Sequence, residues 1–248
     1  MSHVRRALTA FALVLAPPLA VGCGPTISTQ VRMETNFAPG STGTLSKDGL
    51  TAEVPMIKQM PEQFRVEVAA CDLDGKPSAD GVPTTISAIA PGAELYQLKL
   101  SNQTDHIIRL QGSVIRLFDP AENQIEPQSK EEVVATASRP SNLAQQGACP
   151  AAAAKISDTL ATVRFIGPNT ELLPGTTTTG YLSFVPPNSA LPGTWKLSLY
   201  EIPVKVDAAG VAIAKTRFDF AYLRKKFQDT YSQELMGERR LVETKEIP

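Results

Sequence analysis

The chain has 248 residues, of which 42% are hydrophobic and 20% are charged, so it can bury a sizeable core and is too apolar for wholesale disorder. Its 24 basic residues are balanced by 25 acidic residues, which gives a formal net charge of -1. That balance gives no electrostatic reason to expect nucleic acid or another polyanion as a partner.

The N-terminus predicts an export signal that ends in a lipid-attachment site. Two arginines precede an apolar run over 7–21, which is shorter than the roughly 20 residues that a membrane-spanning helix needs. The run ends in Leu19-Ala20-Val21-Gly22-Cys23, which resembles the bacterial lipobox. The resemblance implies a signal peptide over 1–22 and a diacylglycerol thioether and acyl chains such as palmitate on Cys23. An uncleaved helix with an incidental cysteine is the alternative.

Several acyl chains attach a protein stably to a membrane, whereas one chain is marginal. The residue after Cys23 is Gly24 rather than Asp, and the resemblance to enteric lipoproteins then implies sorting to the outer membrane, facing the periplasm. We therefore expect an envelope protein held by lipid rather than by charge. Residues 23–46 are rich in Thr, Ser, Gly and Pro without sustained periodicity, which predicts a flexible tether.

Residues 47–223 have the pattern of an antiparallel β-sandwich. Short apolar segments alternate with polar residues and end at Gly, Pro, Asn or Asp, as strands do. The segments predicted as strands are 64–70, 96–100, 107–110, 114–118, 160–166, 179–185, 195–199, 204–206 and 211–220. This spacing, without strand–helix alternation, indicates an all-β sandwich rather than a doubly wound fold. A partly closed barrel is the alternative.

Two segments resemble a known family. They are Leu98-Lys99-Leu100-Ser101-Asn102, which runs into Ile107-Ile108, and Leu173-Pro174-Gly175, which leads to Gly180-Tyr181-Leu182-Ser183-Phe184. These motifs resemble the telokin-like, immunoglobulin-like sandwich domains of exported bacterial lipoproteins. The resemblance implies an immunoglobulin-like antiparallel β-sandwich but no particular reaction. The Cys–Trp–Cys core signature of antibody-type domains is not present.

Residues 129–158 interrupt the strand pattern. Ser129-Lys130-Glu131-Glu132 has the form of a capping box and predicts a short helix that ends before Arg139-Pro140. An alanine-rich stretch follows. Long inserts on a rigid sandwich often carry binding residues, and a solvated excursion without a role is the alternative.

Cys71 and Cys149 remain once Cys23 is acylated, and an even pair in an oxidising envelope favours a disulfide. The bridge would close a loop of roughly 80 residues, worth at most about 4 to 5 kcal/mol in the chain-entropy model. Two free thiols are the alternative.

The sequence offers no catalytic constellation. His106 is the only histidine outside the signal peptide, and neither metal-ligand spacing nor a G-x-S-x-G elbow accompanies it. Asp72, Asp74 and Asp80 lie near glycines, but Lys76 stands where a calcium loop would place a further ligand, so an acidic turn is the better interpretation. We predict no catalytic residue, no metal and no cofactor.

The C-terminal stretch over 224–248 predicts a helix. Apolar residues recur at helical spacing, with Gly237 placed as a C-cap. They are Phe220, Leu223, Phe227, Tyr231 and Leu235. The helix would close an open edge of the sandwich, or would present Phe227, Tyr231 and Leu235 to a partner protein or to lipid.

Together these features predict a lipid-anchored envelope protein that acts as a non-catalytic binding or accessory subunit. Its membrane attachment is the acylated Cys23, and an envelope protein partner would contact the 129–158 insert or the C-terminal helix. The alternatives are an envelope enzyme, or a carbohydrate-binding module that acts on peptidoglycan or polysaccharide.

Overall fold

The computed structural model describes residues 26–57, 59–69, 71, 76, 83–208, 211–233 and 238–248. The chain divides into two compact units. The larger unit comprises Val31–Phe227 and Glu246–Pro248. The smaller unit comprises the segment that ends at Gln30 together with Gln228–Lys245. The predicted signal peptide over 1–22 and the lipidation residue Cys23 lie outside the described residues.

The described part of the chain is mostly strand. The strands are β1 (Thr26–Phe37), β2 (Thr44–Lys47), β3 (Leu50–Glu53), β4 (Arg65–Val68), β5 (Thr84–Ser87), β6 (Glu94–Asn102), β7 (Ile108–Arg109), β8 (Val114–Phe118), β9 (Gln124–Ile125), β10 (Glu171–Leu172), β11 (Thr177–Phe184), β12 (Gly193–Val206), β13 (Ala212–Gln233) and β14 (Arg240–Ile247). The helices are α1 (Lys130–Ala137), α2 (Pro140–Gln145) and α3 (Ala152–Ala161), with a 3-10 turn at Glu62–Phe64.

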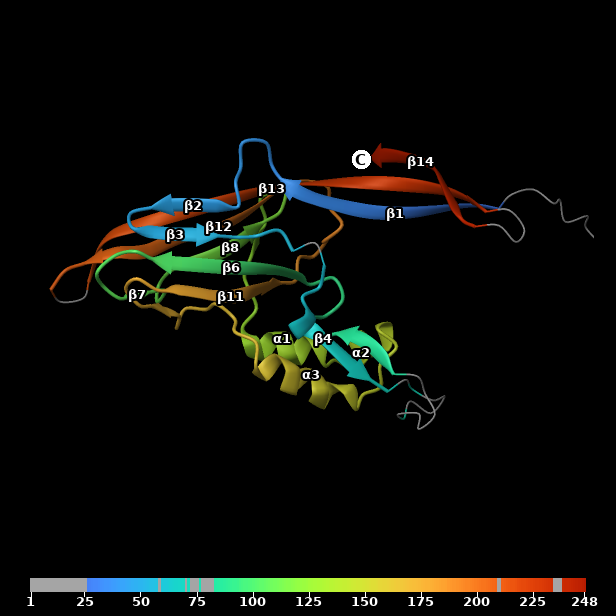
Figure 1. Cartoon of the computed structure of the whole chain (residues 1–248), viewed down its shortest axis with the longest axis horizontal. Helices are drawn as coiled ribbons and strands as arrows, with labels where there is room; N and C mark the ends of the chain where they lie inside the picture. Colours follow the sequence, from blue (N-terminus) through green and yellow to red (C-terminus); the bar gives the residue numbers. More distant parts are fainter. Residues whose placement is uncertain are drawn as a thin grey trace, which may run out of the picture. The chain divides into compact units, whose positions relative to one another are not determined.

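The larger unit contains the predicted β-sandwich. One sheet has the order β11-β6-β3-β2 and the other has the order β1-β13-β12-β8-β9, with antiparallel pairing along both (Figure 1). On β6 and β12 every second side chain is buried, including Leu98, Leu100, Trp195 and Leu197. These residues meet in one hydrophobic core, so the all-β sandwich is confirmed. The hairpin predicted between 204–206 and 211–220 is the β12–β13 hairpin.

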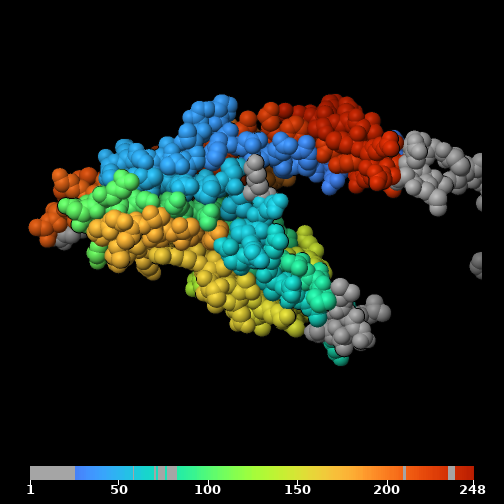
Figure 2. Space-filling view, in the orientation of Figure 1, coloured from blue at the N-terminus to red at the C-terminus, as the bar shows by residue number. Residues whose placement is uncertain are grey.

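The insert forms a second hydrophobic core with the β4–β5 hairpin. The capping box of α1 is present, with Ser129 accepting from the Glu132 amide and the Glu132 carboxylate accepting from the Ser129 amide. Phe64 and the inner faces of α1, α2 and α3 are buried together, and Figure 2 shows this region as a continuous surface in teal and yellow. The predicted short helix is confirmed, and the 129–158 insert is a packed layer rather than a solvated excursion.

The strand predicted over 160–166 is wrong, because helix α3 occupies the segment as far as Ala161. Its buried residues Ala152, Ile156 and Leu160 recur every fourth position, which is helical spacing. A short apolar run such as 160–166 fits either a strand, with a period of two residues, or a helix, with a period of 3.6 residues. The alanines that precede it have a high helix propensity and favour the helix.

The flexible tether predicted over 23–46 is also wrong for its described residues. Thr26–Phe37 forms β1 and Thr44–Lys47 forms β2. Strand β1 pairs with β13, and β2 pairs with β3. The β1–β13 ladder joins distant segments, so the local polar composition gives no sign of it. The β2–β3 ladder is a hairpin closed by Asp48-Gly49, both with positive φ, and this local turn signal was missed.

The predicted C-terminal helix over 224–248 is wrong for the described residues, which form the end of β13 and β14. Burial on β13 follows a period of two, with Phe218, Phe220, Tyr222 and Arg224 inside. The apolar residues at helical spacing therefore fall on both faces of a strand. Pairing with β12, β1 and β14 supplies the backbone hydrogen bonds that outweigh local propensity.

Candidate functional site

A cavity of about 410 Å³ lies in the larger unit where residues of β1, β6 and β13 meet the segment that follows β3. We call it the Arg224 pocket. Its apolar wall includes Met33, Met56 and Ile57, and its polar wall includes Glu94, Tyr96, Tyr222 and Arg224. The volume falls within the roughly 300–1,000 Å³ typical of small-molecule sites.

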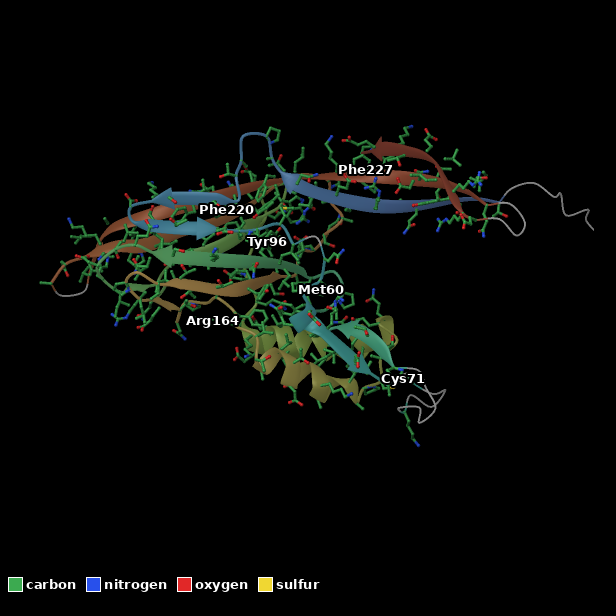
Figure 3. The ribbon with its side chains drawn as sticks, in the orientation of Figure 1. Met60, Cys71, Tyr96, Arg164, Phe220 and Phe227 are labelled. Carbon is green, nitrogen blue, oxygen red and sulfur yellow. A yellow bond between two sulfur atoms is a disulfide. The ribbon has the colours of Figure 1, made fainter. Side chains whose placement is uncertain are left out.

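Strand alternation places the polar wall. Glu94 and Tyr96 are two positions apart on β6, and Tyr222 and Arg224 are two positions apart on β13. Residues two apart on a strand project from the same face, so each sheet contributes one pair. Figure 3 shows Tyr96 on β6, among the side chains of the sandwich.

Arg224 and Glu94 form a buried ion pair at the centre of the polar wall. Their side chains are 6% and 13% exposed. Both guanidinium Nη atoms bind the Glu94 carboxylate; Arg224 Nη2 also donates to Tyr96 Oη at 3.0 Å, and Arg224 Nη1 donates to the Ser189 carbonyl at 3.2 Å. Tyr96 Oη in turn donates to Glu94 Oε2 at 3.1 Å. The network satisfies both charges of the pair.

Aromatic rings enclose this network. The Arg224 guanidinium carbon lies 3.9 Å from the Trp195 ring centroid, a cation–π contact. The Tyr222 ring lies 5.5 Å from the Tyr96 ring and 5.3 Å from the Phe37 ring, measured between centroids. The rings restrict the rotation of Tyr222 and Arg224, so the polar wall is preorganised.

Two buried donors of the polar wall are left over from this network. No described residue accepts a hydrogen bond from Tyr222 Oη or from Arg224 Nε, although both atoms are buried. Leaving a buried donor unsatisfied costs about 1–3 kcal/mol. Both residues line the pocket, but the two donor atoms are themselves shut off from solvent, so an acceptor reaches them only when the surrounding side chains adjust.

The ionisation of the polar wall is fixed by its burial and by its ion pair. Burial raises the pKa of Tyr96 well above its usual value, and the Glu94 charge raises it further. Burial also raises the pKa of Tyr222. Burial alone would lower the pKa of Arg224, but the hydrogen bonds to Glu94 outweigh this and raise it. Both tyrosines are therefore hydroxyl donors and Arg224 is a cation at any physiological pH.

The predicted cysteine pair is present. Cys71 and Cys149 form a bonded pair with their Cα atoms 5.3 Å apart, and Cys149 is buried. The bridge connects a residue three positions after β4 to the segment between α2 and α3, and Figure 3 labels Cys71, its first residue.

The other residues singled out in the sequence are not brought together. Phe227 lies under the Arg32 guanidinium at 4.9 Å in the larger unit, and Tyr231 lies under that of Arg239 at 3.8 Å in the smaller unit. Leu235, Asp72, Asp74 and Asp80 lie outside the described residues. His106 Nδ1 lies 3.1 Å from Asp105 Oδ1 in an exposed pair beside β6. Phe227 and Tyr231 therefore lie on a strand rather than on the helix that the sequence predicts.

Sequence reasoning missed the residues of the polar wall. Arg224 falls at the start of the segment that was predicted as a C-terminal helix. The alternation of Phe218, Phe220 and Tyr222 places position 224 on the same buried face, which is the pattern that could have identified it.

Within the described ranges, no group of three or more His, Cys, Asp or Glu residues is arranged to hold a metal ion. None of the helices described is both long enough and apolar enough to span a membrane. No protein-family model, curated protein or solved structure matches the chain. The functional argument therefore depends on the residues of this chain.

Proposed function

We propose that the chain is an exported, lipid-anchored envelope protein that acts as a non-catalytic binding subunit, with the Arg224 pocket as its ligand site. The observation that carries this proposal is the pair of buried donors, Tyr222 Oη and Arg224 Nε, in the polar wall of a cavity of about 410 Å³. A ligand that accepts from them after a small side-chain adjustment would remove the cost of two unsatisfied donors.

The chemistry of the walls favours a neutral, amphipathic ligand. Glu94 already balances the charge of Arg224, so an anionic head group would add an uncompensated negative charge. The opposite wall, with Met33, Met56 and Ile57, suits an apolar body, and methionine side chains adapt their shape to what they contact.

The ion pair also supports binding rather than acid–base catalysis. Among the described residues that line the pocket, Glu94 is the one carboxylate, and Arg224 and Tyr96 occupy both of its oxygens. A general base must reach the proton that it removes and have a pKa near the working pH, and the Glu94 side chain is only 13% exposed in its ion pair. Burial moves the two tyrosines further from that range.

Export and lipid anchoring are supported by the lipobox-like segment that ends at Cys23 and by the Cys71–Cys149 bridge. Disulfides persist in oxidising compartments such as the bacterial periplasm. In this proposal the chain is an immunoglobulin-like domain of the kind found in exported bacterial lipoproteins. Acyl chains attach it to the outer membrane, and its partner is another protein of the envelope.

Ligand binding can be followed through Trp195, the single tryptophan of the chain, which lies against Arg224. The mature chain carrying Cys23→Ser would be titrated with 1-decanol and with decanoate while tryptophan fluorescence is recorded. We expect a saturable change, with the alcohol bound more tightly than the carboxylate.

Tyr222→Phe should weaken decanol binding about fivefold, because it removes one hydrogen bond worth about 1 kcal/mol. The half-buried Tyr200 supplies the control, and Tyr200→Phe should leave the affinity unchanged. If neither probe gives a saturable change, the pocket is not a ligand site of this kind and the proposal fails.

A further inference from the structure

The smaller unit contains a three-stranded sheet built from the start of β1, the end of β13 and most of β14. Figures 1 and 2 show its blue and red strands side by side. Thr244 Oγ1 donates to Asp229 Oδ1 at 2.7 Å, and Arg239 covers the Tyr231 ring. Asp229 on β13 therefore faces Thr244, and the later residue Tyr231 faces the earlier residue Arg239. The residue numbers run in opposite directions, so β13 and β14 are antiparallel.

Strand β1 is antiparallel to β13 as well. Arg32 contacts Phe227, and the Ala38 amide donates to the Ala221 carbonyl at 2.9 Å, so residue numbers again run in opposite directions. The first residues of β1 and β14 and the last residues of β13 therefore lie at one end of the three-stranded sheet. We call this end the anchor-proximal end.

Large apolar side chains are exposed at the anchor-proximal end. Ile27 is 60% exposed, Leu241 is 57% exposed and Val242 is 63% exposed. The exposed Arg239 and Arg240 lie directly before Leu241 in the chain. Aliphatic side chains beside arginines are typical of segments that lie at a membrane interface.

The covalent chain places this end near the proposed anchor. Thr26, the first residue of β1, follows Cys23 by three positions. Three residues span at most about 10 Å, which is comparable to the thickness of one headgroup layer. If Cys23 carries acyl chains in a bilayer, the start of β1 must lie at the surface of that bilayer.

We propose that the anchor-proximal end docks on the membrane, with Ile27, Leu241 and Val242 at the boundary of the acyl chains and Arg239 and Arg240 on phospholipid phosphates. This inference rests on the lipid anchor of the proposed function. Arginine binds phosphate through two parallel hydrogen bonds, which suits it to anionic lipid. A membrane is favoured over a second copy as the occupant because Thr26, at this end of the sheet, follows Cys23 by only three positions.

Vesicle flotation of the mature chain carrying Cys23→Ser separates docking from acylation. We expect it to float with vesicles of phosphatidylcholine and phosphatidylglycerol, and less with phosphatidylcholine alone. The double variant Leu241→Asp/Val242→Asp should lower the partition coefficient about tenfold or more, because it removes two interfacial aliphatic side chains and adds negative charge. Arg239→Gln/Arg240→Gln should reduce the preference for the anionic vesicles.

The matched control is Val211→Asp/Ile213→Asp, which changes two residues of similar exposure, 60% and 57%, at the start of β13 and directly before it. It should leave the partition coefficient within about twofold of that of the unsubstituted chain. Circular dichroism melting of every variant verifies that each one folds.

Three results would overturn the docking. They are no flotation with either vesicle, equal losses in Leu241→Asp/Val242→Asp and in the control Val211→Asp/Ile213→Asp, or a solution dimer that Leu241→Asp/Val242→Asp dissociates. Mass spectrometry of the native N-terminus tests the anchor separately. An acylated Cys23 without vesicle binding by the unacylated chain refutes docking alone. An unmodified Cys23 with vesicle binding retained refutes the anchor while supporting the docking surface.

Discussion

The guanidinium of Arg224 on β13 binds the carboxylate of Glu94 on β6, although the two residues are 130 positions apart in the chain. The pair links the two sheets of the sandwich and holds the polar wall of the Arg224 pocket. Removing two ions from water is costly, and here the cost is offset by the hydrogen bonds of Tyr96 and the Ser189 carbonyl and by the Trp195 ring.

Glu94→Gln should destabilise the fold by about 3 kcal/mol or more, because it leaves a buried arginine without its counterion. Urea denaturation followed by circular dichroism measures the change in the free energy of unfolding. The surface pair of Lys99 and Glu53, at 3.0 Å, is the control, and Glu53→Gln should cost less than about 1 kcal/mol. Equal effects of the two variants would contradict a special role for the buried pair.

Replacing Cys71 and Cys149 together with serine should lower the free energy of unfolding by about 4 kcal/mol, because the bridge constrains a long loop of the unfolded chain. The bridge closes a sequence separation of 78 residues. Urea midpoints of the oxidised protein and the double variant give the comparison. Coincident unfolding curves would show that the bridge contributes nothing to stability.

Ser129→Ala should destabilise the helical layer by about 1 kcal/mol, since it removes the side-chain cap of α1. Ser129→Asp keeps an acceptor at the same position and should be nearly neutral. Thermal melts of both variants test the capping box, and a loss of equal size in the aspartate variant would contradict this explanation.

Asp219 should make the fold sensitive to acid. Burial alone would raise its pKa, but hydrogen bonds from Arg217 and Ser198 outweigh burial and lower the pKa below its usual 3.8. A carboxylate with a lowered pKa stabilises the fold above its unfolded pKa, and this stability is lost as the pH falls below about 4.

The difference in Tm between the unsubstituted protein and Asp219→Asn should therefore shrink as the pH is lowered from 7 to 3. Asp158→Asn, at an exposed position of α3, supplies the comparison. A difference that stays constant over this range would show that Asp219 contributes through packing rather than through charge.

The sequence pattern of a few consecutive residues was sufficient to predict those elements that contact the elements next to them in the chain. The hairpin of β12 and β13 and the capped helix α1 are of this kind, because a turn and a capping box each act over a few residues. The disulfide followed from cysteine number and compartment.

The errors over β1 and over the end of β13 lie where long-range pairing decides the structure. Strand β1 is polar and was predicted as a tether, and Phe227 and Tyr231 were predicted on a helix. Strand β13 supplies the ladder partner of β1, and β1 and β14 supply the ladder partners of the end of β13. The Glu94–Arg224 pair joins two distant strands, so it could be found only after the register of both sheets was known.

The most direct test of the account is the mass of the mature N-terminus of the protein purified from membranes. We expect a chain that begins at Cys23 and carries a diacylglyceryl group and further acyl chains. A chain that begins at Met1, or a Cys23 that carries no lipid, would contradict the proposal that this is a lipid-anchored binding protein of the cell envelope.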